Sequence, residues 1–155
     1  GEAAGKWAGQ AWLLAGPEPT EEQLQDARKG ASVALEIGRL DIGQGAIVAE
    51  GLVLCVEAQE GTDEMLKRCA SLPVEIRGTD GARRGVLVKR PKPQQERRID
   101  LPAIGVATVE GAATAGLAGI AYEADGALLM DAENAKARAS ELGLFLYGFP
   151  KDWDA

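Results

Sequence analysis

The order of apolar and polar positions along the chain predicts that short strands and short helices alternate. Apolar runs typical of buried strands lie at 45–49, 52–57, 85–89, 118–123 and 144–149. Apolar residues at helical spacing predict helices at about 20–37, 62–71, 106–115 and 133–142. Strands that alternate with helices favour an α/β fold. We therefore predict an α/β domain with a mixed sheet and helices on both of its faces.

Local signals place several boundaries of these elements. Thr20-Glu21-Glu22-Gln23 is a capping box that begins the first helix, and Gly38 fits the position just after its end. Glu50-Gly51 predicts a tight turn between the first two strands, and Asp125-Gly126 predicts one between 118–123 and 127–130. The fold is thus expected to contain two β-hairpin insertions, while 74–83 is expected to be a polar loop.

The beginning of the chain has no clear period. We expect 1–19 to be an irregular lead-in and 20–155 to be the α/β domain. Trp7 and Trp12 lie in this lead-in. Two readings stay open for them: they pack on this domain's own core, or they face an absent neighbour.

Composition restricts the chemistry. The chain has no histidine, which removes the commonest general base, the commonest zinc ligand and the usual Ser or Cys triads. Chemistry would then rest on carboxylates, Lys and Arg, backbone N–H groups or a hard metal ion. Cys55 and Cys69 lie in apolar segments and are expected to be buried free thiols. A net charge of -7 argues against nucleic acid as a partner, and no apolar run is long enough to span a membrane.

A basic segment interrupts this acidic chain. Seven of the 17 basic residues lie between 83 and 98, where the sequence reads RRGVLVKRPKPQQERR. Lys89 ends an apolar strand, and the prolines on either side of Lys92 fix the backbone there. Lysine is a compact positive charge that suits phosphate. The alternative is a basic surface loop that only contacts solvent.

Polar residues also follow the other strands, where ligands bind in open α/β sheets. Glu60-Gly61-Thr62-Asp63 opens a helix, so it offers either an anion site or, through Glu60 and Asp63, oxygen ligands for a metal. Plain capping with Thr62 at the N-cap explains the same residues. Three readings stay open for Asp100: a salt-bridged surface acid, a metal ligand, or the base that orients water. Asp41, Gly43 and Gln44 precede the first hairpin, where Gly43 permits close approach of a ligand.

Four segments together resemble the LpxI-type UDP-2,3-diacylglucosamine pyrophosphatases of lipid A biosynthesis. They are LDIGQGAIV, EGTDEML, GVLVKRPKPQQERRIDLPAIG, and AGLAGIAYEA with the closing GLFLYG, and they span about 41–148 in the expected order. The long basic segment that ends in RRIDLPAIG is the most specific of them. Arg90 stands in it where a small residue is more usual.

The resemblance implies an activity. It implies hydrolysis of the pyrophosphate of UDP-2,3-diacylglucosamine to UMP and 2,3-diacylglucosamine 1-phosphate (lipid X), with Mg²⁺ or another divalent cation. It implies a cytoplasmic enzyme that contacts the inner face of the inner membrane transiently. The lipid-linked UDP-sugar would be its substrate, and a missing N-terminal domain of the same protein would be its partner. In that family, 1–19 would be the linker or lead-in from the missing domain, and 20–155 would be the catalytic α/β domain.

The resemblance also suggests roles for residues. The acids closest to the reaction would be Asp100 and Asp63. Metal ligands would be drawn from Asp63, Glu60, Asp100 and Asp41. Contacts with phosphate or with other parts of the substrate would come from Lys89, Lys92, Arg98, Thr62, Gln44, Gly43 and Glu123.

Two other classes of function stay open at this point. A non-catalytic regulatory domain that binds a nucleotide or phosphate would use the same lysines but would not need the acids. A purely structural interaction domain would need neither.

Overall fold

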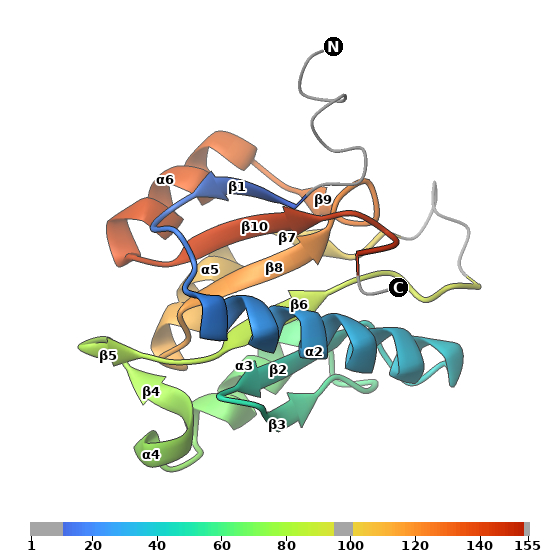
Figure 1. Cartoon of the computed structure of the whole chain (residues 1–155), viewed down its shortest axis with the longest axis horizontal. Helices are drawn as coiled ribbons and strands as arrows, with labels where there is room; N and C mark the ends of the chain where they lie inside the picture. Colours follow the sequence, from blue (N-terminus) through green and yellow to red (C-terminus); the bar gives the residue numbers. More distant parts are fainter. Residues whose placement is uncertain (1–10, 95–100, 154–155) are drawn as a thin grey trace.

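A six-stranded mixed sheet forms the centre of the computed structural model, which describes residues 11–94 and 101–153 (Figure 1). In spatial order its strands are β1 (Trp12–Ala15), β10 (Phe145–Phe149), β8 (Gly119–Glu123), β6 (Val86–Lys89), β2 (Gly45–Ala49) and β3 (Leu52–Val56). β6, β8 and β10 are parallel to one another, whereas β1 and β2 are antiparallel to their neighbours. The predicted mixed sheet is confirmed.

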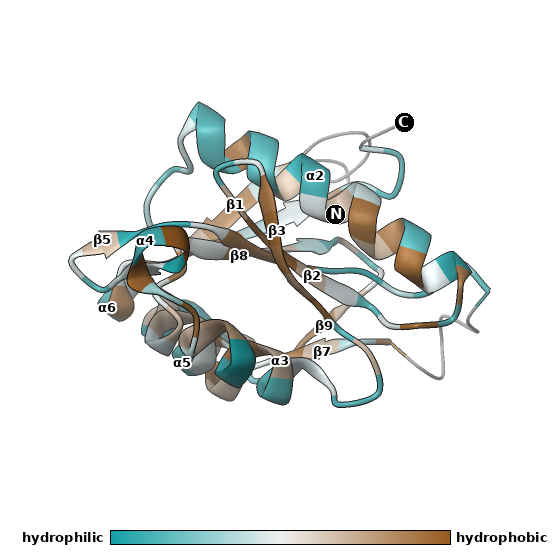
Figure 2. Ribbon diagram, turned by 90° about the horizontal axis from the view of Figure 1, so that it is seen from below, coloured by the Kyte–Doolittle hydropathy of each residue, from teal (hydrophilic) through white to brown (hydrophobic). Residues whose placement is uncertain are grey.

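Helices cover both faces of this sheet, as predicted (Figure 2). One face carries α2 (Glu21–Arg39), and the other carries α3 (Thr62–Ala70), α5 (Val106–Thr114) and α6 (Ala132–Leu142). The smaller elements are α4 (Val74–Arg77), β4 (Gly78–Thr79), β5 (Ala82–Arg83), β7 (Ala103–Ile104) and β9 (Leu128–Leu129). The result is a three-layer α/β/α arrangement.

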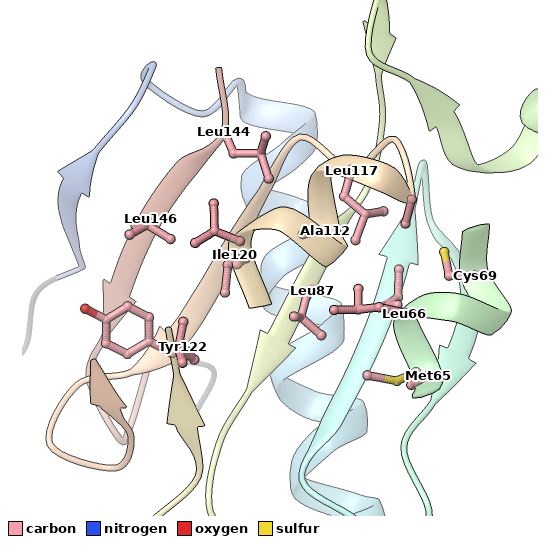
Figure 3. Close-up of a cluster of buried hydrophobic side chains, with 14 of the residues drawn as sticks. Met65, Leu66, Cys69, Leu87, Ala112, Leu117, Ile120, Tyr122, Leu144 and Leu146 are labelled. Carbon is pink, nitrogen blue, oxygen red and sulfur yellow. The ribbon is translucent and has the colours of Figure 1, made fainter. Parts of the chain in front are cut away.

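The strands supply two hydrophobic cores because successive side chains point to opposite faces of a sheet. In β6, Val86 and Val88 pack on the α2 side, while Leu87 belongs to the larger core beneath α3 and α5. Figure 3 shows this larger core, where Leu87 and Ile120 lie among side chains of the helices. Burial of each such aliphatic side chain contributes about 1.5–3 kcal/mol.

Small residues allow α2 to lie close to the sheet. Ala27, Ala31 and Ala34 are at most 1% exposed. A Cβ atom on Gly30 would stand 2.4 Å from Cγ2 of Val88. The glycine is therefore required by packing, although it lowers the intrinsic helix propensity by about 1 kcal/mol relative to alanine.

The start of α2 was predicted correctly and its end was not. The backbone N–H of Gln23 donates to Thr20 Oγ1 (3.1 Å), and the N–H of Thr20 donates to Gln23 Oε1 (2.9 Å), so the capping box is formed. Gly38, however, lies inside the helix, which runs on to Arg39. Its missing side chain leaves room for the chain at Lys92 and Pro93, whose nearest atoms would be 3.3 and 3.2 Å from a Cβ.

Only one of the two expected hairpins lies where it was placed. Glu50 and Gly51 have φ values of 49° and 83° and join β2 to β3, which confirms the first. The second was wrong, because β9 after Asp125-Gly126 pairs in parallel with β7 and not with β8. The segment 74–83 was expected to be a loop, but it contains α4 and the short hairpin of β4 and β5.

The expected lead-in also differs from the structure. Residues 12–15 form β1, an edge strand that pairs with β10, so Trp12 belongs to the main sheet. Trp7 lies outside the described residues. Cys55 and Cys69 are buried and free, as predicted. Within 11–94 and 101–153, no helix combines the length and the apolar character needed to cross a bilayer.

Candidate functional site

Most of the predicted site residues that the structure describes lie at or beside one edge of the sheet. β3, β6 and β8 run in the same direction, and β2 runs against them. The last residues of β6 and β8, Lys89 and Glu123, therefore share an edge with Glu57, which follows β3, and with Gln44, which precedes β2. This is the edge at which open α/β sheets bind ligands.

Glu57 connects three segments at this edge. Its Oε1 accepts the backbone N–H of Gln44 at 2.9 Å, and its Oε2 accepts the hydroxyl of Thr62 at 2.6 Å. The ammonium of Lys89 donates to the hydroxyl oxygen of Thr62 and lies 3.5 Å from Glu57 Oε2. Gln44, Thr62 and Lys89, which were each predicted to contact phosphate or substrate, are thus held by one buried carboxylate.

Thr62 was predicted to be the N-cap of the second helix, and this was wrong. Gly61, with φ 87°, is the N-cap of α3, and no side chain caps the helix there. The hydroxyl of Thr62 gives its hydrogen to Glu57 and accepts from Lys89, so the side chain points toward the sheet. The first N–H groups of α3 are left without a side-chain cap, in the arrangement that favours an anion.

Lys89 is buried to an unusual degree for a lysine. Its side chain is 6% exposed, and that of Glu57 is 8% exposed. Burial lowers the pKa of Lys89, and the charge and hydrogen bond of Glu57 oppose that effect. Asp63 also raises the pKa of this lysine through its charge. Nearby carboxylates therefore offset part of the effect of burial on this lysine.

The next residue, Arg90, points to the opposite face of the sheet. Its guanidinium donates two hydrogen bonds to Glu123 Oε1, from Nε at 3.1 Å and from Nη2 at 2.9 Å. It also donates to the carbonyl of Ala31 at 3.1 Å and to that of Lys151 at 2.9 Å. Both charged side chains are 2% exposed. Glu123 thus lies in the interior as the counter-charge of Arg90, and its contact with substrate stays a prediction.

The loop after β6 is fixed to the end of α2. Lys92 Nζ donates to Asp41 Oδ1 at 2.7 Å, and Gln94 donates to the carbonyl of Gly38 at 2.8 Å. The hydrogen bond and charge of Lys92 hold the pKa of Asp41 below its usual value. Lys92 is therefore held in place by these contacts as well as by its two prolines.

Gly43 was predicted to allow a ligand to approach the backbone. In the structure the atom that approaches is the carbonyl oxygen of Glu57, which would lie 2.0 Å from a Cβ at this position. The glycine therefore allows the chain before β2 to pack on the residue that follows β3.

The candidate metal ligands are not gathered into one site among the described residues. Asp41 is paired with Lys92, and Glu60 forms an ion pair with Arg68 at 2.6 Å. Over 11–94 and 101–153, no group of three or more acidic or cysteine side chains is placed to hold a metal ion. Asp100 and Arg98 lie outside the described residues, so their predicted roles stay predictions.

A cavity of about 380 Å³ lies where the first turns of α3 and α5 meet. Its lining includes Glu60, Gly61, Thr62 and Asp63 from the start of α3, together with Ala103, Gly105, Ala107, Thr108 and Met130. A second cavity of about 390 Å³ continues between α3 and α5, and both cavities are lined by Asp63 and Ala107. The walls of both are mainly apolar, and those of the second include Leu66, Ala70 and Gly111. Two neighbouring cavities therefore lie beside the start of α3, and Asp63 lines both of them.

Residues 10–147 match the family model described as the LpxI C-terminal domain. The chain belongs to the LpxI family. It is also 61% identical over 130 residues to the UDP-2,3-diacylglucosamine pyrophosphatase LpxI of Caulobacter vibrioides. That alignment covers 84% of this chain and 46% of the LpxI relative, so the chain spans about half the length of the curated protein that it matches. The predicted family is confirmed.

At this edge of the sheet, two buried charged residues of the LpxI domain, Glu57 and Arg90, were not among the predicted site residues. Glu57 ends the run LVLCVE, where an acid after five apolar residues was taken as the polar end of a strand. Arg90 was noted only as an unusual residue of the basic segment. A charged side chain at the end of an apolar run was the one available signal for both, since such residues are seldom buried unless they are paired.

Proposed function

We propose that this chain is the hydrolytic domain of an enzyme that cleaves UDP-2,3-diacylglucosamine to UMP and 2,3-diacylglucosamine 1-phosphate in lipid A biosynthesis. Water attacks one phosphorus of the pyrophosphate, the bond from that phosphorus to the bridging oxygen breaks, and two phosphate monoesters leave. The observation that carries the proposal is that Gln44, Thr62 and Lys89 lie together at the edge of the sheet where β6 and β8 end. They do so in a domain that is 61% identical over 130 residues to the LpxI pyrophosphatase of Caulobacter vibrioides.

The chemistry of the described residues supports this function. A pyrophosphate carries negative charge, which a lysine and the uncapped N–H groups of α3 would stabilise. Asp63 lines the first cavity at the same helix end, where it could orient water. The mainly apolar second cavity beside it suits a substrate with hydrocarbon chains. A histidine base is not required for such a reaction.

We propose that the reaction depends on Mg²⁺ or another divalent cation. Mg²⁺ binds through carboxylates and phosphate oxygens and would neutralise charge on the leaving phosphate. Asp63 and Asp100 are the acids that we propose as its ligands, with Glu60 and Asp41 in support. Glu60 and Asp41 would first have to leave Arg68 and Lys92.

We further propose that a preceding domain completes the enzyme, since the chain covers 46% of its LpxI relative. The site would then work at the cytoplasmic face of the inner membrane, where a lipid-linked substrate is anchored. Contact with that membrane would be transient.

The test is release of UMP from UDP-2,3-diacylglucosamine in detergent micelles, with Mg²⁺ and with EDTA. The chain is assayed alone and as the longer protein that includes the preceding domain. Asp63→Asn and Asp100→Asn are expected to lose most of the activity without loss of folding. Activity that survives EDTA would remove the metal from the proposal. If no form of the protein produces UMP, the chain is better explained as a regulatory domain that binds a nucleotide or phosphate.

A further inference from the structure

Glu57 is the residue at which the separate parts of the proposed site meet. It follows β3, and its carboxylate reaches the segment before β2, the first residue of α3 and the last residue of β6. The backbone contributes as well, because the N–H of Glu57 donates to the carbonyl of Gly45 at 2.9 Å. Its own carbonyl fills the space that Gly43 leaves empty.

The two carboxylate oxygens of Glu57 have different partners. Oε1 fixes the backbone of Gln44, while Oε2 fixes the hydroxyl of Thr62 and attracts the ammonium of Lys89. Because the hydroxyl of Thr62 gives its hydrogen to Glu57, its oxygen is directed toward Lys89. The carboxylate thereby sets the orientation of a hydroxyl, an ammonium and a loop at once.

Stability alone is a poor explanation for this arrangement. Removing a carboxylate and an ammonium from water costs several kcal/mol per ion, and apolar residues of similar volume are often as stable or more stable. The charged group is better explained by what it positions. Glu57 is absent from the lining of the cavity at the start of α3, whereas Thr62 lines it, so Glu57 would act through its partners.

We propose that Glu57 is a positioning residue of this site, which holds Gln44, Thr62 and Lys89 in the arrangement that binds the pyrophosphate. This inference rests on the proposed function, because those three residues are its phosphate contacts.

The test compares Glu57→Gln with a matched control, Asp26 of α2, which contacts the turn at the other end of the β2–β3 hairpin. Asp26 is 3% exposed, and its carboxylate accepts the backbone N–H groups of Glu50 and Gly51, both at 2.8 Å. Asp26→Asn and Glu57→Gln each neutralise a buried acid that holds β2 and β3. We expect Glu57→Gln to lower kcat/KM for UMP release about 100-fold, mainly in kcat, because misplacement of catalytic contacts has effects of that size. Asp26→Asn should change it less than 3-fold while it lowers the stability.

A double variant separates positioning from general damage. If Glu57 acts through Lys89, then Glu57→Gln should have little further effect in a Lys89→Met background, since residues that act as a unit are not additive. Losses that multiply, or a loss below 3-fold in Glu57→Gln, would overturn the proposal. Circular dichroism checks the fold of each variant. If Glu57→Gln does not fold, Glu57→Asp replaces it, since it keeps the charge but is one methylene shorter.

Failure of the proposed function can be told apart from failure of this inference. If the wild-type protein releases no UMP, binding of inorganic pyrophosphate is measured by titration calorimetry in the same variants. Binding by wild type and Asp26→Asn that falls at least 10-fold in Glu57→Gln would support Glu57 as the positioning residue of a phosphate site. Equal binding in all three proteins, or none in wild type, would overturn the inference.

Discussion

Replacement of Arg90 by methionine should destabilise the domain more than almost any other single change at the site. The substitution removes the guanidinium that lies 2.9 Å from the carboxylate of Glu123, whose side chain is 2% exposed. It also removes the hydrogen bonds that Arg90 donates to Ala31 and Lys151, which connect β6 to α2 and to the segment after β10. Loss of one partner of a buried pair typically costs about 3–5 kcal/mol. The total free energy of unfolding of a natural protein is about 5–15 kcal/mol, so this loss is a large fraction of it.

Urea unfolding followed by circular dichroism measures the effect. With a slope of about 2 kcal/mol per M of urea, a loss of 4 kcal/mol lowers the midpoint by about 2 M. Glu123→Gln should lower the midpoint as well, because it removes the carboxylate that lies 2.9 Å from the guanidinium. The double variant Arg90→Met/Glu123→Leu should lose less than the sum of the corresponding single losses, since both members of the buried pair are then replaced by apolar residues.

An exposed ion pair provides the control for this experiment. Lys67 and Glu64 lie 2.9 Å apart, with side chains 74% and 57% exposed. Lys67→Met should leave the midpoint of urea unfolding nearly unchanged, because exposed ion pairs contribute little to stability. If Arg90→Met cost less than about 1 kcal/mol, or if the losses at Arg90 and Glu123 were additive, the buried pair would not have the energetic role described.

Three further predictions concern the site itself. Gly43→Ala should lower the free energy of unfolding by about 1–3 kcal/mol, because its methyl group would meet the carbonyl of Glu57 at 2.0 Å; urea unfolding checks this, and a neutral effect would contradict it. Lys92→Met should raise the pKa of Asp41 toward its ordinary value, which the carboxyl carbon shift in NMR reports; an unchanged pKa would mean that the pair does not persist in solution. In Glu57→Gln the alkaline limb of the kcat/KM profile should move to lower pH, because Glu57 raises the pKa of Lys89 while burial lowers it; the limb should stay in place if Lys89 takes no part.

Local signals predicted much of the fold. The capping box at Thr20 and the turn at Glu50-Gly51 depend on residues three or fewer positions apart, and both were correct. The hairpin at Asp125-Gly126 failed because β9 finds its partner in β7, about 25 positions earlier in the chain. The edge strand β1 was missed for a similar reason, since its partner β10 lies at the other end of the chain. Pairing between distant segments is not written in the turn residues.

The site shows the same limit. Its place at the carboxyl ends of the strands followed from the fold class, and the residues around Lys89 and Thr62 were named from their types. The interactions among them were not predictable. Thr62 looked like an N-cap because the sequence contains an acidic first turn, but in three dimensions Glu57 and Lys89 both come within reach of its hydroxyl. Glu57 itself could be recognised only once β3 and β6 were placed on either side of β2.

Lys89 and Arg90 are neighbours in sequence whose charges are buried on opposite faces of the sheet. A slip of β6 by one residue would exchange the two faces and leave both cations away from Glu57 and Glu123. The apolar residues of β6 are all similar in size, so they would tolerate such a slip far better than the charges would. Lys89 and Arg90 therefore fix the register of β6 in the centre of the sheet. They disfavour folding in a shifted register, and Lys89 also places one cation at the proposed site.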